Sequence, residues 1–284
     1  MKILSLVIPF MVFLIVSATQ AGAQGQIKQT QIGDSFHVLD GRGGFGSNVG
    51  VLAHGSGLLI VDSMMAKSTE ELKAALRGVS SKAVTHIINT HAHSDHTGGN
   101  AVFADTGALL LAPASGAAMG TAEGVADASK YSLIVGGVQV EIYPVLSHSE
   151  DDVLVYFPAQ NVLFMGDTYT TNWHPTFYAG GAIGQLAAVD KALSLADAET
   201  LVVPGHGSVS NRQGLLVYRE AFQAWVARLG GLLAEGKHGN ALYKDRGLRE
   251  IVQRFLIGTT HEPLPEGAYR RFIERSIAAE LALN

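Results

Sequence analysis

The sequence contains no cysteine, and this absence excludes disulfide bridges, thiolate nucleophiles and cysteine metal ligands together. A metal site in this chain must therefore be built from histidine, aspartate and glutamate. Runs of lysine and arginine interleaved with aromatic residues are also missing, and the formal net charge is −5. Such a weakly acidic chain offers no electrostatic surface to nucleic acid or to an anionic membrane, so we expect a small-molecule substrate as its partner.

Charged residues are scarce, at 16%, whereas hydrophobic residues make up 47% of the 284 positions. This composition is typical of a globular protein with a sizeable core. Because no low-complexity linker divides the chain, we predict a single domain at residues 24–284, with a helical C-terminal part at about residues 211–284.

The first 23 residues have the pattern of a secretory signal peptide. Lys2 supplies a positive charge, residues 3–16 are almost entirely apolar, and Ala21-Gly22-Ala23 gives a small-x-small cleavage pattern. A membrane anchor is the alternative, but a membrane-spanning helix needs about 20 apolar residues and this run is shorter. No second apolar run is long enough to span. We therefore predict an exported protein, periplasmic or secreted, without a stable membrane span after cleavage.

Strand-like and helix-like patterns are interspersed along the chain. Alternating or clustered apolar residues predict strands over residues 48–53, 57–61, 83–89, 133–135, 138–143, 153–157, 161–165 and 201–203. The first two pair as a hairpin, and Gly136-Gly137 marks the turn of another. This order favours an α/β protein with mixed sheets covered by helices over a purely parallel array.

Four segments have helical spacing. A capping box from Ser68 to Glu71 opens a helix that runs to about residue 78. One face of a second helix carries Ile183, Leu186, Val189 and Leu193. The core face of a longer helix, which ends near residue 236, carries Tyr218, Phe222, Trp225, Leu229 and Leu232. The last helix is predicted over residues 268–282.

A glycine-rich segment at residues 41–46 matches the G-x-G-x-x-G pattern of dinucleotide-binding proteins. That site requires a helix directly after the glycines, because the pyrophosphate lies on the helix N-terminus. Here a predicted strand follows instead. We interpret the segment as a flexible glycine loop, which can also lie beside a substrate cleft.

The densest group of metal-binding residues follows the predicted strand at residues 83–89. Three histidines and one aspartate fall within six residues: His91, His93, Asp95 and His96. Imidazole and carboxylate are suitable zinc ligands. The alternative is a solvated surface cluster, which this density and placement disfavour. One short loop of this kind can supply ligands to two adjacent metals.

Three further candidates follow predicted strands in the same way: His148, Asp167 and His206. Taken singly, a lone histidine is usually structural or exposed, and a Gly-Asp pair is usually a turn. All three, however, share with the histidine cluster a position past the carboxyl end of a strand. That is where open α/β sheets place their sites.

At these residues the sequence resembles the metallo-β-lactamase superfamily. His91-x-His93-x-Asp95-His96 resembles its HxHxDH signature, and the surroundings of His148, Asp167 and His206 match its other ligand motifs in order. The resemblance runs from about residue 43 to residue 207. Asp62, which follows a predicted strand, resembles the early aspartate of the family; a strand-end turn is the other interpretation.

The resemblance implies an αββα sandwich of two mixed sheets flanked by helices, with two zinc ions at one edge. One metal would take His91, His93 and His148. The second would take Asp95, His96 and His206, with Asp167 bridging both. Asp62 would orient the ligand loop by hydrogen bonds.

The metals are expected to be zinc because the superfamily's redox di-iron members have glutamate where this chain has His93. The ligand set of nitrogen and oxygen also suits iron or manganese. In the implied reaction a hydroxide held between the metals attacks an acyl carbon, and Asp95 orients that hydroxide and accepts its proton.

Two other residues are candidates for contact with the substrate. Tyr169 and His174 lie in a predicted loop after Asp167, where they could stabilise an oxyanion; an ordinary surface loop is the alternative. The remaining histidines are interpreted as structural or exposed: His37, His54, His86, His238 and His261.

The expected activity is hydrolysis of an ester, thioester, lactone or amide. A β-lactamase of the type without a cysteine ligand is an alternative, although a bridging Asp167 is more similar to glyoxalase-II-type thioesterases and lactonases. A periplasmic zinc-binding accessory protein without activity is the alternative from another class; the complete ligand set argues against it.

Overall fold

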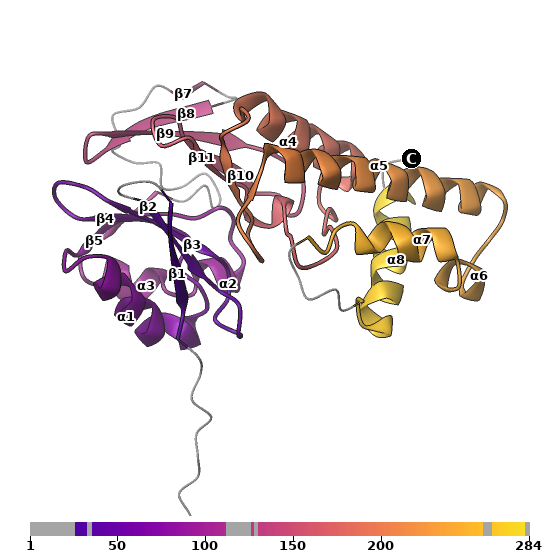
Figure 1. The fold of residues 1–284 in the computed structure, drawn as a ribbon, viewed down its shortest axis with the longest axis horizontal. Helices are drawn as coiled ribbons and strands as arrows, with labels where there is room; N and C mark the ends of the chain where they lie inside the picture. Colours follow the sequence, from indigo (N-terminus) through magenta and orange to yellow (C-terminus); the bar gives the residue numbers. More distant parts are fainter. Residues whose placement is uncertain (1–25, 33–35, 112–125, 128–129, 258–262, 282–284) are drawn as a thin grey trace, which may run out of the picture.

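The computed structural model describes residues 26–32, 36–111, 126–127, 130–257 and 263–281. The predicted signal peptide and His261 lie outside these residues. Within them, no helix is both long and apolar enough to cross a membrane. Two β-sheets lie face to face, with helices on both outer sides (Figure 1).

The first sheet has six strands in sequence order. The first four pair antiparallel in succession, whereas the fifth strand is parallel to both the fourth and the sixth. The strands are β1 (Lys28–Ile32), β2 (Phe36–Asp40), β3 (Val49–Ala53), β4 (Leu58–Val61), β5 (Val84–Ile88) and β6 (Leu109–Leu110). The predicted hairpin at residues 48–61 is confirmed as β3 and β4.

The second sheet has seven strands, in the order β13-β12-β11-β10-β9-β8-β7. Among its described strands, only β11 and β12 are parallel to each other, so both sheets are mixed as predicted. The predicted glycine turn joins β8 and β9. The strands are β7 (Ala126–Asp127), β8 (Lys130–Val135), β9 (Val138–Pro144), β10 (Val153–Phe157), β11 (Val162–Phe164), β12 (Leu201–Val203) and β13 (Ser210–Asn211).

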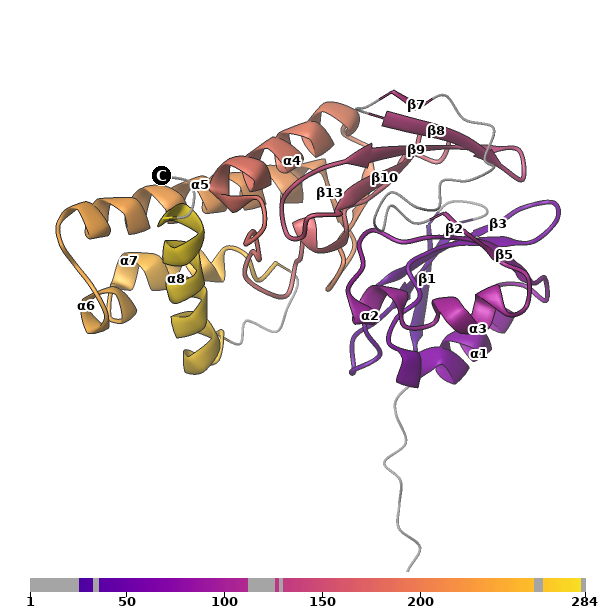
Figure 2. The ribbon, with the colours of Figure 1, turned by 180° about the vertical axis from the view of Figure 1, so that it is seen from behind.

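Helices cover the outer side of each sheet (Figure 2). The first sheet carries η1 (Ala66–Ser68), α1 (Thr69–Val79), α2 (Ser94–Thr97) and α3 (Asn100–Ala104). After the 3₁₀ turn η3 (Gly166–Thr168), α4 (Gly181–Leu195) and α5 (Arg212–Ala234) lie on the second sheet. To one side of the sheet, α7 (Arg246–Gln253) packs on α5, α8 (Glu266–Leu281) packs on α4, and α6 (Asn240–Tyr243) packs on α8. Three buried apolar clusters fill the spaces of this αββα arrangement: one between the sheets and one under each helical layer.

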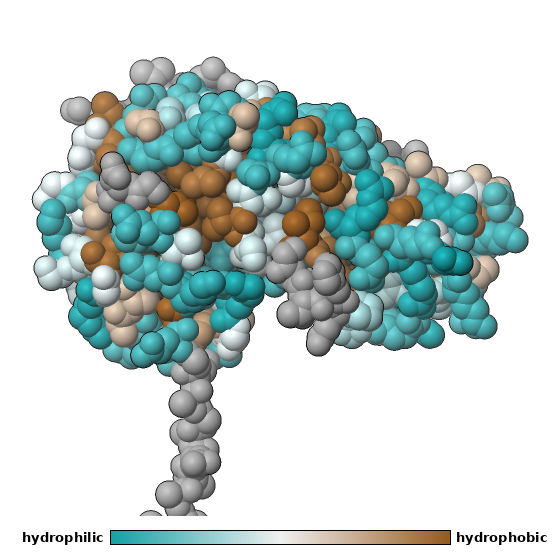
Figure 3. Space-filling model, in the orientation of Figure 1, coloured by the Kyte–Doolittle hydropathy of each residue, from teal (hydrophilic) through white to brown (hydrophobic). Residues whose placement is uncertain are grey.

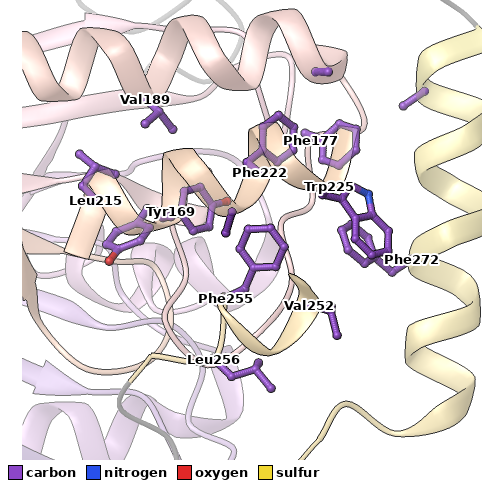
Figure 4. Close-up of a cluster of buried hydrophobic side chains, with 14 of the residues drawn as sticks. Tyr169, Phe177, Val189, Leu215, Phe222, Trp225, Val252, Phe255, Leu256 and Phe272 are labelled. Carbon is purple, nitrogen blue, oxygen red and sulfur yellow. The ribbon is translucent and has the colours of Figure 1, made fainter. Parts of the chain in front are cut away.

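The largest apolar cluster lies between the second sheet and the C-terminal helices. The aromatic face predicted for α5 is confirmed, since all five of its predicted core residues are buried. Figure 4 shows Phe222 and Trp225 packed among Tyr169, Phe177, Phe255 and Phe272, with Trp225 beside Phe272 of α8. Figure 3 shows mostly hydrophilic residues over the outer surface of α5, α6 and α7. This side faces solvent, so only the side of α5 that faces the core is apolar.

Two local predictions are wrong in part. The Ser68 side chain makes no capping hydrogen bond, because Ser68 ends a 3₁₀ turn and lacks the extended conformation of a capping residue. Of the four residues predicted on one face of α4, Val189 is buried and Leu186 and Leu193 pack partly buried against the core, but Ile183 is 73% exposed. The buried side of this helix also carries Ala182, Gln185 and Ala188.

Candidate metal centre

All seven predicted ligands lie in segments that follow strands, and the structure brings them together at one edge of the sandwich. Four of them lie between β5 and α3. The others follow β9, β11 and β12. Their nitrogen and oxygen atoms form three overlapping groups, within each of which all the atoms lie within 4.8 Å of one another. These groups are His91, His93 and His148; His91, His96 and Asp167; and Asp95, His96 and His206.

The first group consists of three histidines. The Nε2 atoms of His91 and His148 lie 3.0 Å and 2.9 Å from Nδ1 of His93. His91 is buried, whereas His93 is exposed, so this group opens to solvent on the His93 side. Three imidazole nitrogens that converge in this way can hold one zinc ion and leave a position for water or substrate.

The last of these sets, Asp95, His96 and His206, is called the second group below, and it combines two histidines with a carboxylate. His206 Nε2 lies 3.2 Å from Oδ2 of Asp95, and His96 Nε2 lies 3.9 Å from the same oxygen. His96 is fully buried, and Asp95 is partly exposed. This group matches the second ligand set that the sequence resemblance implies.

Asp167 lies between the two groups. Its Oδ1 atom is 3.4 Å from Nε2 of both His96 and His206, and its Oδ2 atom is 3.7 Å from Nε2 of His148. Each carboxylate oxygen therefore faces a different group. This is the geometry that a bridging carboxylate needs.

The donor atoms fit a pair of metal ions. Among the described residues, Nε2 of His96 and Oδ1 of Asp167 are buried but lack a hydrogen-bond partner. Leaving such groups unpaired costs about 1–3 kcal/mol each, and a bound cation between them removes that cost. The all-nitrogen-and-oxygen donor set suits zinc, and it also suits iron or manganese.

The pKa values in the second group reflect these close contacts. Burial disfavours the charged form of His96, but Asp62 and Asp167 outweigh burial and hold its pKa well above the usual value. Burial likewise acts against the Asp167 carboxylate, yet His206 and His96 hold its pKa well below the usual value. The hydrogen bond with His206 lowers the pKa of Asp95 to about 2. Both carboxylates are therefore ionised at neutral pH, as metal ligands must be.

Asp62 orients the histidine segment from behind. Its Oδ1 accepts a hydrogen bond from the Thr90 backbone N–H at 2.8 Å, and its Oδ2 accepts from the Thr90 hydroxyl at 2.9 Å. The same Oδ2 lies 2.8 Å from Nδ1 of His96. Nδ1 of His96 is thereby occupied, and Nε2 is directed at Asp167. The structure thus places Asp62 where the resemblance puts it.

Two glycines allow the ligand segments to approach one another. A Cβ atom at Gly166 would lie 2.6 Å from the Thr90 hydroxyl oxygen, and φ at this position is 51°. A Cβ atom at Gly205 would lie 2.1 Å from Oδ1 of Asp167. Any side chain at either position would displace a ligand segment.

Asp152, which the sequence analysis did not single out, supports His148. This buried carboxylate accepts hydrogen bonds from the Ser149 backbone N–H and hydroxyl and from the Ser147 hydroxyl, at 2.6–3.1 Å. Ser147 in turn bonds Thr168 at 2.7 Å and so joins the His148 turn to the Asp167 segment. The available signal was the density of serine and aspartate around His148, which is typical of side-chain-capped turns.

Asn48 holds the His206 segment and was also missed. Its side-chain N–H₂ donates to the carbonyl oxygens of Pro204 and Gly207, both at 2.9 Å. Its backbone N–H donates to the carbonyl oxygen of Gly205 at 2.8 Å. No local pattern indicated this role, because these partners lie more than 150 residues away.

A cavity of about 310 Å³ lies beside His206. Its wall includes the glycine loop at residues 41–46, together with Asn48, Met65 and Asn172. Strand β3 and not a helix follows the loop, as expected. The glycine loop therefore lies beside a cavity next to the candidate metal centre.

Tyr169 and His174 do not lie where substrate contact was predicted. Tyr169 is completely buried, and its hydroxyl donates to Ser210 at 2.9 Å. His174 is 6% exposed, and its ring is stacked on Phe272. Both side chains belong to the helical side of the core, because the segment after Asp167 turns inwards.

Of the other histidines, His54 and His86 bond Thr85, consistent with structural roles.

Comparison with known proteins finds a matching family model, the metallo-beta-lactamase superfamily, over residues 42–206. A metallo-beta-lactamase type 2 of Bacillus cereus is 30% identical over 194 residues, which cover 61% of this chain and 71% of that protein. A hydroxyacylglutathione hydrolase of Nitrosococcus oceani is 33% identical over 142 residues, or 48% of this chain and 54% of that protein. The chain thus spans about half the length of that hydrolase.

Solved structures share the fold at low sequence identity. A metallo-beta-lactamase from Pontibacter korlensis superposes with a TM-score of 0.57 at 21% identity, over 70% of this chain and 99% of the other. A stereoselective inverting sec-alkylsulfatase from Pseudomonas sp. superposes with a TM-score of 0.64 at 14% identity, over 88% of this chain and 50% of the other. The second superposition therefore includes more of this chain than the first.

Proposed function

The chain belongs to the metallo-beta-lactamase superfamily, and we propose that it is a hydrolase that uses two zinc ions bound by its seven histidine and aspartate ligands. The observation that carries the proposal is the position of Asp167. One of its oxygens faces His96 and His206, and the other faces His148. A carboxylate shared in this way serves two metals, whereas a single metal would leave three or more of the ligands without a role.

The reaction assigns distinct tasks to the residues of the chain. When bound, two zinc ions supply a water that ionises near neutral pH and positive charge for the oxygen that gains electrons. Asp95, ionised and partly exposed, is the group that orients this water and accepts its proton. Asp62 and Asp152 keep the ligands in place from the two sides.

We propose an ester, thioester, lactone or amide as the substrate. Two features support an ester-type substrate over a β-lactam: Asp167 lies where it would bridge the two metals in a chain without cysteine, and the hydroxyacylglutathione hydrolases are among its relatives. A β-lactamase without a cysteine ligand is the second candidate. It is favoured by the longer alignment with the type 2 enzyme of Bacillus cereus.

An accessory zinc-binding protein without activity is the alternative outside enzymes. The complete ligand set and the solvent-open His93 argue against it.

We further propose that the protein is exported and acts in the periplasm or outside the cell, on the basis of the signal pattern in residues 1–23. The single domain at residues 24–284 is part of the same proposal.

The test is a substrate panel on protein whose metal content has been measured. Chromogenic esters, thioesters, lactones and a chromogenic cephalosporin are assayed with and without chelator. We expect two zinc ions per chain and chelator-sensitive turnover of an ester-type substrate. His93→Ala and Asp95→Ala should each lower kcat at least about 100-fold, because each removes a ligand or the proton acceptor.

Three results would contradict this proposal. Full activity in either variant would remove these residues from the site. Preference for the cephalosporin would favour the β-lactamase. Zinc binding without turnover of any substrate in the panel would favour the accessory protein.

A further inference from the structure

His148 is oriented by a residue that lies far away in the sequence. Its Nδ1 atom lies 2.9 Å from the carbonyl oxygen of Thr176 and 2.6 Å from the Thr176 hydroxyl. Since a carbonyl oxygen only accepts, Nδ1 carries the proton and donates. The lone pair is therefore on Nε2, which lies 2.9 Å from Nδ1 of His93. Thr176 thus sets both the tautomer and the direction of one ligand of the first group.

A stack of three rings includes the chain just before Thr176. His174, two residues earlier, lies parallel to Phe272 of α8, with 4.3 Å between centroids and 14° between planes. Phe272 lies parallel to Trp225 of α5, at 4.2 Å and 15°. Two members of this stack come from helices, and Figure 4 shows Trp225 and Phe272 side by side at the end of the aromatic cluster.

Hydrogen bonds fix the two ends of the stack. Trp225 donates its Nε1–H to the Ser276 hydroxyl at 3.1 Å, and that hydroxyl donates to the Phe272 carbonyl oxygen at 2.7 Å. At the other end, His174 Nδ1 lies 2.8 Å from the Pro175 carbonyl oxygen. The segment that contains Pro175 and Thr176 is therefore connected to α8 through the ring of His174.

We propose that helices α5 and α8 set the zinc affinity of the first ligand group through this stack, with Thr176 as the positioning residue for His148. Both helices lie outside the region that matches the family model, residues 42–206. The inference rests on the proposed function only in requiring that zinc binds. It gives the C-terminal helices a part in the metal site that the ligand motifs do not assign.

The contacts predict an effect on one group only. His91 and His93 come from the segment after β5, and His96 is held by Asp62. His206 lies in a segment that Asn48 holds. Loosening the stack should therefore displace His148 and leave the second group intact.

The experiment measures zinc affinity in two backgrounds. Asp95→Ala breaks the second group and leaves the first, whereas His93→Ala breaks the first and leaves the second. Phe272→Leu, which keeps the core filled but removes the central ring, is added to each. Competition with a chromophoric chelator gives the affinity, and absorption of the cobalt-substituted protein reports the ligand geometry.

In the Asp95→Ala background, we expect Phe272→Leu to weaken zinc binding about 10-fold and to shift the cobalt absorption, as loss of an orienting contact does. In the His93→Ala background the affinity should not change. Phe157→Leu, at a buried phenylalanine of the core between the sheets, is the control for lost packing and should change neither affinity. Equal losses in both backgrounds, or no loss in either, would overturn the proposal.

A second pair of variants serves if Phe272→Leu fails to fold. His174→Phe keeps a stacked ring and should retain affinity within about twofold, whereas His174→Ala should weaken the first group about 10-fold. Equal affinities in these two variants would also overturn the proposal. Turnover is not needed for either measurement, so failure of the hydrolase assignment would leave this test unaffected.

Discussion

The ligand segment of the first sheet and the ligand loops of the second sheet are held in place by different interactions. Behind the segment after β5 lies one buried carboxylate, Asp62, which contacts Thr90 and a ligand ring directly. Behind the Asp167 segment lie neutral groups of the helices: Gln185 and Tyr218 both donate to the Thr168 carbonyl oxygen. Behind Thr176 lies the aromatic stack.

This difference separates two kinds of sensitivity. A buried charge acts through a few short contacts, so a change of one atom can remove its effect. Packed rings act through shape and volume, so they tolerate small chemical changes but not loss of volume. The first sheet should therefore respond to charge, and the second should respond mainly to packing and hydrogen bonds.

The largest effect is expected from Asp62→Ala. The substitution leaves His96 and the Thr90 N–H buried without their partner, which costs about 3–5 kcal/mol of unfolding free energy. We also expect loss of zinc from the second group. Urea unfolding followed by circular dichroism gives the first quantity, and metal analysis gives the second.

Asp62→Asn is the matched variant. Asp62 has φ of 64°, a conformation that asparagine adopts readily, so this variant removes the charge without straining the backbone. If the Asp62→Asn variant were as stable and as zinc-replete as the parent, the buried charge would have no role, and the contrast between the sheets would fail.

A smaller effect is expected from Asp152→Ala in the second sheet. It removes three hydrogen bonds from serine groups around His148, which should cost about 2–3 kcal/mol. Asp152→Asn should recover more than half of this loss, because an amide oxygen can still accept. The same unfolding measurement applies. The opposite result is that Asp152→Asn regains no larger a share of the lost unfolding free energy than Asp62→Asn regains relative to Asp62→Ala. That result would show that both sheets depend on a buried charge to the same extent.

The sequence predicted which side chains gather at the candidate metal centre, because their signal is local. His91, His93, Asp95 and His96 lie within six residues, and each of the other ligands follows an apolar strand. Asp62 and the sandwich of two sheets followed from the family resemblance, whereas the individual strands and the aromatic face of α5 followed from apolar periodicity.

The supporting residues could not be predicted, because their partners are distant. Thr176 and His148 are 28 residues apart, and Asn48 and Gly207 are 159 apart. In α4, periodicity identified three residues that contact the core, but it also included Ile183, which is exposed, and it missed the buried Gln185. A pattern of side chains identifies an amphipathic element, but close packing decides which side faces the core.

The smallest effect concerns pH and the ring stack. Burial, with Arg275 and Arg271 of α8 nearby, lowers the pKa of His174 to about 4, against an unfolded value of about 6.5. The folded state therefore disfavours the charged ring. The unfolding free energy is therefore undiminished above pH 6.5 and decreases as the pH falls towards 4. At pH 5 the decrease is about 2 kcal/mol. His174→Phe should remove this loss, because a stacked phenyl ring does not titrate.

The measurement compares unfolding free energies of the parent and His174→Phe between pH 7 and pH 5, with chelator present so that zinc release does not contribute. Replacement of the exposed His238 by glutamine controls for the removal of one histidine as such. We expect the parent to lose about 2 kcal/mol more than His174→Phe, and the His238 variant to behave as the parent does. Parallel curves for the parent and His174→Phe would mean that the stack accepts a charged ring. The ring stack behind the second sheet would then accept a charged side chain without loss of stability. The proposed difference between this stack and the buried carboxylate Asp62 would fail.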